Sequence, residues 1–553
     1  MVLWSAIKKK LEVPKDTNAF YENDSLTNRD LIPIPPERRT WNGIAYATYW
    51  VIEGVSISGY TTGSTLVGFG LSPKQSIACS IAAGVLYGIL AVVMGWIGSH
   101  QHIGFPLFSR VMYGINGSAF GIIMRCMTGI IWWGVQAYFG AQAITICIGA
   151  MNPSFLTWDS FNNANGITSA NFVGLVIYCV LMVPCLWIPP EKLHFFFRVV
   201  TFITVGAFFG LIGFTTRKAG GAGSMFHHPS QTFTTSGELG WACVKGIFSV
   251  LGTTSTGCLG QSDFTRYAKH KRSPVISQLL GAPCALAFSS IIGVVATSAA
   301  NDLMGEVIWN PVALLGAIQQ YENNSSSARA AVFFGAFAFV MQQMAINLLL
   351  NTLSTSMDAA GLFPKYLNIR RGSFLVMCVG VLIWPWKILS SAKAVVVFGT
   401  GWGIFASPQT GILIAKYYII SKRKILLQDL YVRSNDSIYW YTGGWDWRSM
   451  VAFFVGCIFL FPGLAADANG KQIGFWTRIY FISFAWGLVF AGSTVVILHY
   501  LFPQMDISPT SKVDNVYDDN GVAFATTQEV ISGEEFSGSV EKIEIVVGSK
   551  EKQ

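Results

Sequence analysis

The segment IIWWGVQAYFG, residues 130–140, places Gln136 four residues after Trp132, inside a run that is mostly apolar from Met127 to Ala150. On a helix this spacing puts both side chains on one face, so an aromatic plane and an amide can address the same ligand. A flat heterocycle could stack on the indole while the carboxamide meets N–H and C=O groups on the edge of the ring. The alternative is that Gln136 hydrogen-bonds another helix across a bundle.

A second pair of amides occurs in MQQMAINLLLNTLSTSMD, where Asn347 and Asn351 are again four residues apart. Two amides in an apolar helix are costly unless they find partners in the bundle interior or in a wet cavity. We therefore expect both side chains to face inward. Structural hydrogen bonding between helices is the alternative to contact with a ligand.

Three ionisable residues, Glu53, Arg125 and Asp263, also lie in or beside apolar segments. A charge at membrane depth is a functional candidate by default. Glu53 precedes a stretch rich in Ser and Gly and could carry a proton, and the alternative is a permanent pair with Arg125, which itself needs a counter-charge or a route to water. Asp263 and the nearby Arg266 lie at the end of their segment, where we expect a gate or an ion pair.

The elements that must position these residues are membrane-spanning helices. Of 553 residues 52% are hydrophobic and only 12% are charged, against roughly 25% charged in soluble domains. Repeated apolar stretches of about twenty residues can each cross a hydrocarbon core of about 30 Å. We predict an all-α polytopic membrane protein with twelve spans, at residues 44–71, 74–97, 115–149, 171–188, 194–214, 241–264, 276–299, 329–361, 373–389, 394–420, 449–466 and 474–502.

The loops predict the orientation. Lys and Arg gather after even-numbered spans, as in RYAKHKR at 266–272 and SKRK at 421–424, which predicts that residues 1–43 and 503–553 are both cytoplasmic. The N-terminus lacks the apolar core of a cleavable signal, and the acidic residues 503–553 are predicted to be disordered. Trafficking or ubiquitination machinery is the expected partner of these tails. The net charge of +8 is scattered over short loops, which favours membrane orientation over binding to nucleic acid.

Two spans have broken helical character. Residues 53–68 read EGVSISGYTTGSTLVG, and residues 252–263 read GTTSTGCLGQSD. Small polar side chains can satisfy backbone groups where a helix is interrupted, although close packing through small faces is the alternative. Because these segments begin two successive sets of five spans, they match the discontinuous helices of inverted-repeat transporters. We therefore expect inverted repeats at 44–214 and 241–420, followed by two further spans at 449–502.

Other functional classes lack support in the sequence. There is no His-Glu-x-x-His helix, no phosphate-cradling Gly-rich loop after a strand and no pair of cysteines with metal-ligand spacing, so we expect neither an enzyme nor a metal or cofactor. A channel is disfavoured because no carbonyl filter motif or ring of charges is present. A receptor that senses its ligand without moving it is the alternative from a different class.

Six longer motifs lie between residues 28 and 502: NRDLIPIPPERRTW, GSTLVGFGLSPKQS, HIGFPLFSRVMYGINGSAFG, WWGVQAYFGAQ, GQSDFTRYAK and MDAAGLFPKYLNIRRG. Together they resemble the nucleobase–cation symporter family, particularly its fungal uracil and allantoin permease-like branch. The resemblance implies a LeuT-like fold, with spans 1–5 and 6–10 as inverted repeats and two additional helices.

The resemblance also implies a substrate site. The stacking aromatic residue and the glutamine of span 3 correspond to Trp132 and Gln136, and the substrate-facing asparagine of span 8 corresponds to Asn351. By similar placement, Ser56 in the break of span 1 and Thr254 in span 6 are expected to line the site.

Departures from the family bear on the coupling ion. In the sodium-coupled bacterial hydantoin member, hydroxyl residues of span 8 ligate the ion, whereas the matching positions here are Ala345 and Ile346. Since two oxygen ligands are lost, we expect proton coupling, with Glu53 as the leading carrier, and no use of sodium. Span 10 carries Lys416 where many relatives have an acidic residue, which leaves the chemistry of a gate there open.

The resemblance implies a proton-coupled secondary transporter in the plasma membrane. Its expected cargo is a small planar heterocycle such as uracil, allantoin or a related nucleobase or nucleoside, imported by alternating access. A vitamin such as thiamine, nicotinamide riboside or pyridoxine is the alternative within the family. The expected partners are therefore the heterocycle and the lipid bilayer, and no nucleic acid.

Overall fold

The computed structural model describes residues 12–13, 26–27, 30–163, 166–188, 194–228, 233 and 235–503. In these ranges the regular elements are helices. Two isolated β-bridges also occur, and these residues form no strand. The segment predicted to be disordered lies outside the described residues from 504 onward, as does most of the N-terminal tail.

Within the described ranges, seven helical stretches are long and apolar enough to cross a membrane: Pro73–Gln101, Ser118–Met151, Phe196–Ala219, Ser273–Met304, Ser326–Leu362, Trp447–Ala468 and Ser483–Leu501. Each coincides with one of the twelve predicted spans. The remaining predicted spans are also helical, but they are shorter, interrupted or less apolar. The all-α, polytopic class is therefore confirmed.

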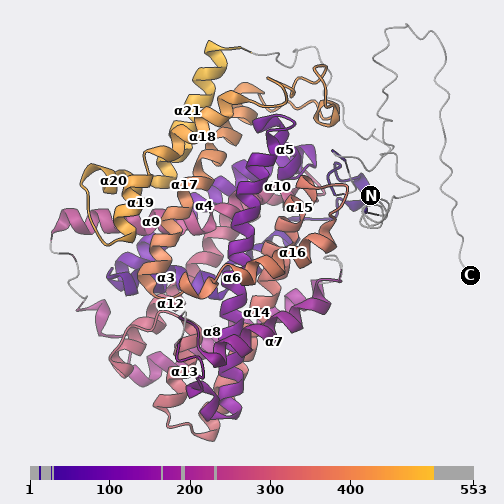
Figure 1. The fold of residues 1–553 in the computed structure, drawn as a ribbon. Helices are drawn as coiled ribbons and strands as arrows, with labels where there is room; N and C mark the ends of the chain where they lie inside the picture. The colour runs from indigo at the N-terminus through magenta and orange to yellow at the C-terminus, as the bar shows by residue number, and fades with distance from the viewer. Residues whose placement is uncertain are drawn as a thin grey trace, which may run out of the picture.

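The α-helices of the described residues, apart from the single turn Ser273–Ile276, follow one another along the chain in this order. They are α2 (Gly43–Gly54), α3 (Ile57–Phe69), α4 (Pro73–Gln101), α5 (Phe105–Tyr113), α6 (Ser118–Met151), α7 (Ser169–Cys185), α8 (His194–Ala219), α9 (Ser236–Leu259), α10 (Gln261–Thr265), α12 (Ala282–Met304), α13 (Pro311–Tyr321), α14 (Ser326–Ile346), α15 (Leu353–Leu362), α16 (Ile369–Leu382), α17 (Ala392–Ile414), α18 (Trp447–Ile458), α19 (Phe461–Ala468), α20 (Phe475–Phe481) and α21 (Ser483–Leu501). The long helix α6 runs through the centre of the bundle (Figure 1).

The first span is broken where its Ser and Gly residues predict a break. Helix α2 ends at Gly54, and α3 begins at Ile57. Between them Ser56 is extended, with φ −144° and ψ 165°, and its hydroxyl oxygen accepts the Gly59 N–H at 3.0 Å. This hydroxyl is an N-cap, which satisfies one of the donors that the start of a helix leaves unpaired.

The sixth span is interrupted inside the predicted stretch 252–263, near its C-terminal end. Residues 252–259 continue α9 without a break, and the interruption falls at Gly260, before α10. The Thr253 hydroxyl donates to a carbonyl of its own helix at 2.7 Å, so it finds a partner without unwinding the backbone. Close packing explains Gly252, because a Cβ atom there would collide with the Gly399 carbonyl of α17. Helix packing, rather than unwinding, therefore accounts for much of this small-residue stretch.

The eighth span contains a π-helical segment, Asn347–Thr352, between α14 and α15. A π-helix bonds i to i+5, and such single turns inside α-helices are frequent at functional sites. Both asparagines of the sequence pair lie in this segment, and Asn351 donates to Asn347 Oδ1 at 2.8 Å.

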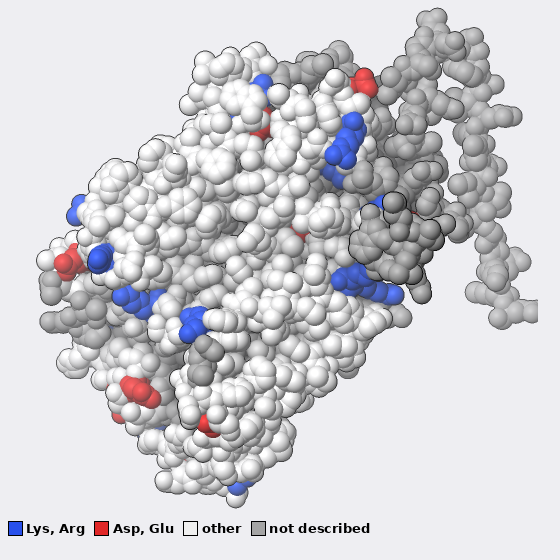
Figure 2. Space-filling model, viewed as in Figure 1, with Lys and Arg blue, Asp and Glu red and all other residues white. Residues whose placement is uncertain are grey.

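The surface suits a lipid environment. Charged side chains are sparse over most of the face drawn in Figure 2. Large apolar side chains are exposed instead, including Phe202 at 77%, Leu382 at 74% and Phe334 at 70%. Because water would penalise this much exposed apolar surface, the chain is a multi-pass membrane protein.

Candidate functional site

A cavity of about 150 Å³ lies among α2, α3, α6, α9, the π segment and α17. Its wall is mostly apolar and aromatic, with a few polar groups, which is the usual character of a small-molecule site. The polar or aromatic lining residues used below are Glu53, Ser58, Tyr87, Arg125, Trp132, Gln136, Thr254, Asn351, Asp358 and Phe398.

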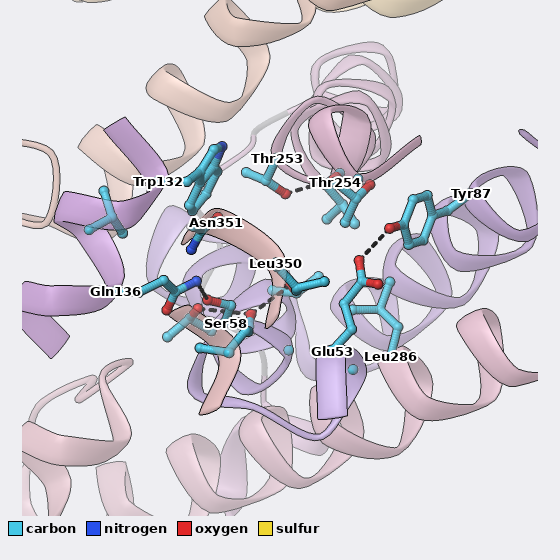
Figure 3. A pocket seen from close by; sticks show the side chains of 18 of the residues that line it. Glu53, Ser58, Tyr87, Trp132, Gln136, Thr253, Thr254, Leu286, Leu350 and Asn351 are labelled. Carbon is cyan, nitrogen blue, oxygen red and sulfur yellow. Dashed lines mark hydrogen bonds between the residues drawn. The ribbon is translucent and has the colours of Figure 1, made fainter. Parts of the chain in front are cut away.

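Trp132 and Gln136 meet at one side of this cavity, as their spacing predicts (Figure 3). Gln136 is 4% exposed, and its Nε2 donates to Ser58 Oγ at 2.7 Å. Its carbonyl oxygen and the indole N–H of Trp132 have no hydrogen-bond partner among the described residues. The Phe398 ring packs edge-on against Trp132, with centroids 5.7 Å apart. The pair thus offers an aromatic surface beside one unused acceptor and one unused donor.

Asn351 lines the same cavity, whereas Asn347 lies behind it and is fully buried. Asn347 donates to the Trp133 carbonyl at 3.1 Å and to the Tyr178 hydroxyl at 3.2 Å. The two members of the sequence pair therefore have different surroundings, since one faces the cavity and the other holds helices together.

Glu53 lies on the opposite side of the cavity, where α2 ends beside α4 (Figure 3). The Tyr87 hydroxyl donates to Glu53 Oε1, and Oε2 has no hydrogen-bond partner in the described part of the chain. The alternative reading of Glu53, a permanent pair with Arg125, does not hold, because Arg125 pairs with Asp263 and Asp358. In the part of the chain that the structure describes, Glu53 thus has no cationic partner, which is the condition a proton carrier needs.

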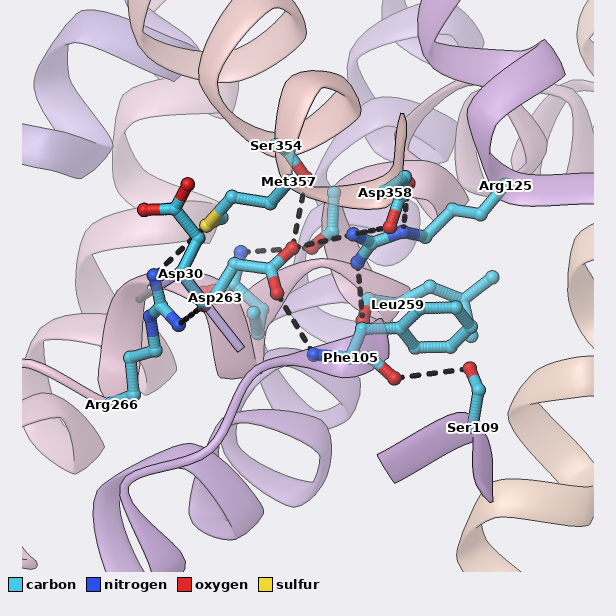
Figure 4. Close-up of polar contacts among 12 residues, drawn as sticks. Asp30, Phe105, Ser109, Arg125, Leu259, Asp263, Arg266, Ser354, Met357 and Asp358 are labelled. Atoms are coloured by element: carbon cyan, nitrogen blue, oxygen red, sulfur yellow. Dashed lines mark hydrogen bonds and ion pairs between the residues drawn. The ribbon is translucent and has the colours of Figure 1, made fainter. Parts of the chain in front are cut away.

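Arg125 forms a buried ion triad with Asp263 and Asp358 (Figure 4). Its Nη2 lies 2.7 Å from Asp263 Oδ2, and its Nε donates to Asp358 Oδ2 at 2.8 Å. Asp263 also accepts the Phe105 N–H at the start of α5 at 2.9 Å and the Ser354 hydroxyl at 2.9 Å. The triad therefore ties α5, α6, α10 and α15 together at one end of the cavity.

Of the two hydroxyl residues predicted for the site, Thr254 lines the cavity and Ser56 does not. Ser56 is fully buried and is not among the residues that line the cavity, because its hydroxyl caps α3. Ser58, two residues later, contacts Gln136 in its place. Thr254 does line the cavity, but its hydroxyl donates to carbonyls of its own helix at 3.1 and 3.2 Å. The expectation for Ser56 is therefore corrected to Ser58.

Sequence reasoning missed Tyr87, Tyr178 and Asp358. The two tyrosines lie in uninterrupted apolar runs, where a tyrosine is common, and only three-dimensional contact with Glu53 or Asn347 reveals their use. Asp358 stands in MDAAG at the end of the eighth span. Arg125 needed a buried counter-charge, so a search for acidic residues at the same depth could have found it.

Comparison with known proteins supplies the context for this geometry. The family model described as permease for cytosine/purines, uracil, thiamine, allantoin matches residues 33–487. The uridine permease of Saccharomyces cerevisiae is 30% identical over 90% of this chain and 78% of its own length. The allantoin permease of the same yeast is 27% identical over 94% and 82%, respectively.

Among solved structures, the inward-facing conformation of Mhp1 superposes with a TM-score of 0.67 at 19% identity, covering 87% of this chain and 96% of that chain. At this identity the likeness shows the fold alone, which is the LeuT-like fold that the resemblance implies. Both the family and the fold are those of membrane transporters. The matched model spans most of the chain, and the protein therefore belongs to the family of permeases for cytosine and purines, uracil, thiamine and allantoin.

Proposed function

We propose that the protein is a proton-coupled importer of a small planar heterocycle, such as uracil, allantoin or a related nucleobase or nucleoside. The observation that carries the proposal is the convergence of Trp132, Gln136, Asn351 and Glu53 on one cavity. An indole face, two amides and a carboxyl are the groups that a flat ring with polar edges requires. Relatives named for uridine and allantoin support this class of cargo.

In the bound state the ring stacks on Trp132 while its polar edge meets Gln136 and Asn351. The Gln136 carbonyl oxygen is buried without a partner in the described structure, so a ligand N–H that reaches it satisfies a group that is otherwise desolvated. A buried polar group left unpaired costs about 1–3 kcal/mol, and the same amount becomes available as binding energy. The ligand therefore completes the polar network of the cavity wall.

Glu53 is the proposed proton carrier. It faces the cavity beside Tyr87, and its second carboxyl oxygen has no partner in the described residues. Binding of a proton at Glu53 removes a charge from a mostly apolar chamber, which favours closure around a neutral ligand. The apolar side chains of Ala345 and Ile346, at positions where the family resemblance implies hydroxyl ligands for sodium, support a proton rather than sodium as the coupling ion.

The Arg125–Asp263–Asp358 triad is the proposed inner gate. It joins α6, α10 and α15 to α5 next to the cavity. The transport cycle then comprises binding from outside, closure of the cavity, separation of the triad and release into the cytoplasm. This direction assumes that both termini are cytoplasmic and that the protein acts in the plasma membrane.

Uptake in a yeast strain lacking its own nucleobase and vitamin transporters tests the proposal. Cells expressing the protein should accumulate radiolabelled uracil or allantoin above the external concentration, and a protonophore should abolish accumulation while removal of sodium has no effect. A competition panel of nucleobases, nucleosides, thiamine, nicotinamide riboside and pyridoxine ranks the ligands. Sodium-dependent uptake that ignores pH contradicts the coupling, preferred uptake of a vitamin contradicts the cargo, and binding without uptake favours a receptor.

A further inference from the structure

A chain of hydrogen bonds behind the cavity runs from the Gln343 carbonyl through Tyr178 and Asn347 to Asn351. The Tyr178 hydroxyl of α7 donates to the Gln343 carbonyl at 2.9 Å and accepts from Asn347 Nδ2 at 3.2 Å. Asn347 Nδ2 also donates to the carbonyl of Trp133, the neighbour of the stacking residue, at 3.1 Å. Asn347 Oδ1 then accepts from Asn351 Nδ2 at 2.8 Å.

The polarity of this chain has only one solution. A backbone carbonyl can only accept, so the group of Asn347 that meets the Trp133 carbonyl must be its amino group. The other end of the same amide is therefore an acceptor, and Asn351 must turn its own amino group toward it. The Asn351 carbonyl oxygen is left without a hydrogen-bond partner among the described residues. Asn351 lines the cavity, so this oxygen is available to a ligand.

The surroundings make this orientation rigid. Asn347 and Tyr178 are fully buried, and the ring of Trp133 packs against Tyr178 with centroids 6.4 Å apart. The Trp133 indole N–H donates to Thr352 Oγ1 at 3.1 Å, which anchors the far end of the π segment to α6. Rotating Asn351 by half a turn would bring two carbonyl oxygens together in a dry site, which is strongly unfavourable.

We propose that Asn347 and Tyr178 are positioning residues that present Asn351 to the ligand as a hydrogen-bond acceptor, so that the site selects rings with an unsubstituted N–H at that edge. The inference rests on the proposed function. Gln136 offers a second acceptor, because its amino group is held by Ser58 and its carbonyl oxygen is unpartnered in the described structure. The favoured cargo is thus a cyclic ureide with free ring N–H groups, and substitution of a ring nitrogen that meets either acceptor weakens binding.

Discrimination between a ring and its N-methylated forms tests this inference. The probe is radiolabelled uracil or radiolabelled allantoin, whichever wild-type cells accumulate, and the competitors are the same ring methylated separately at each ring nitrogen. In the wild type at least one methylated form should compete about tenfold or more weakly than the parent, as expected for a lost hydrogen bond in a desolvated site.

Three variants separate positioning from general support. Tyr178→Phe removes one hydroxyl from the chain of hydrogen bonds, and Asn347→Leu removes the acceptor that holds Asn351. Both variants should therefore lower the discrimination, which is the ratio of the inhibition constants of the methylated and the parent ring, by several-fold. Asn347→Asp, protonated in this dry position, can still donate to the Trp133 carbonyl and accept from Asn351, and it should preserve the discrimination. Tyr138→Phe is the matched control, since Tyr138 is a buried tyrosine on α6 outside the cavity lining whose ring packs near Trp386 at 6.2 Å.

The uptake rate of each variant is divided by its amount at the cell surface, which is measured with a fluorescent tag. The positioning role is overturned if Tyr178→Phe and Asn347→Leu lower the maximal uptake rate but leave unchanged the ratio of inhibition constants of the methylated and the parent ring. Equal competition by parent and methylated rings in the wild type also overturns it. A wild-type protein that accumulates neither of these probes nor any other nucleobase or nucleoside refutes the proposed function itself, so the two failures are distinguishable.

Discussion

The buried ion triad predicts an asymmetric response to neutral substitutions. Arg125 carries the one positive charge between Asp263 and Asp358, and all three side chains are at most 1% exposed. The formal charge of the group is therefore −1. Replacing Arg125 by Met should be far more harmful than replacing Asp358 by Asn, because Asp358→Asn leaves one positive and one negative charge still in contact.

The geometry sets the size of this difference. Both carboxylates contact Nη2 of Arg125, so without the arginine they face each other across roughly 5 Å, which corresponds to a repulsion of about 3 kcal/mol at an effective dielectric constant of about 20. Breaking a buried pair from one side costs about 3–5 kcal/mol in total. Asp358→Asn loses a charge-assisted hydrogen bond worth about 1.5–3 kcal/mol but relieves the excess negative charge, so its net cost should be smaller.

Thermal unfolding of the detergent-solubilised, fluorescently tagged protein measures this order. We expect Asp358→Asn to be closest to the wild type and Arg125→Met to be the least stable. Asp263→Asn should lie between them, because Asp263 also holds the Phe105 N–H and the Ser354 hydroxyl. Equal losses for Arg125→Met and Asp358→Asn would refute the reasoning, and adding Asp358→Asn to Arg125→Met should recover part of the loss.

Three further predictions concern other contacts. Glu53→Gln cannot carry a proton, so uptake should lose its acceleration in acidic medium while ligand competition persists; retained acceleration excludes Glu53 as the carrier. Lys245 lies 2.6 and 2.8 Å from the oxygens of Asp467, so Lys245→Met should destabilise the protein by about 3–5 kcal/mol, and further substitution of Asp467→Leu should restore much of that stability in a thermal melt. Ser58→Ala frees the amide of Gln136 and should raise the apparent substrate constant several-fold at constant surface expression, whereas an unchanged constant argues against Ser58 as its support.

Periodicity and apolar length were enough to predict the helical class, and seven of the predicted spans coincide with long apolar helices of the described residues. The break at Ser56 was also predictable, because extended backbone and a capping hydroxyl are local properties of a Ser- and Gly-rich stretch. In the sixth span the predicted stretch 252–263 contains the interruption at Gly260, but most of the stretch is regular helix, since Thr hydroxyls can bond within a helix and Gly252 serves contact with another helix. Local composition cannot distinguish unwinding from packing.

The site was predictable where two residues share one helix face and less so where partners come from different helices. Trp132 and Gln136 reach one cavity because a spacing of four fixes their relative direction. The same spacing did not predict that Asn347 would lie behind Asn351, because the π segment and Tyr178 determine which amide faces inward. The partners of Arg125 could not be named from the sequence for a similar reason, since pairing in a bundle depends on which helices are neighbours in space.

The apparent substrate constant of Gln136→Ala tests the central claim most directly, namely that this cavity holds the transported ring. With the probe that wild-type cells accumulate, we expect the constant to rise about 5- to 150-fold, equivalent to about 1–3 kcal/mol, at an unchanged amount of protein on the cell surface. Gln142→Ala is the matched control, because Gln142 lies on the same helix, outside the cavity lining, and accepts from Asn310 at 2.9 Å. Kinetics of Gln136→Ala that equal those of the wild type would contradict the account.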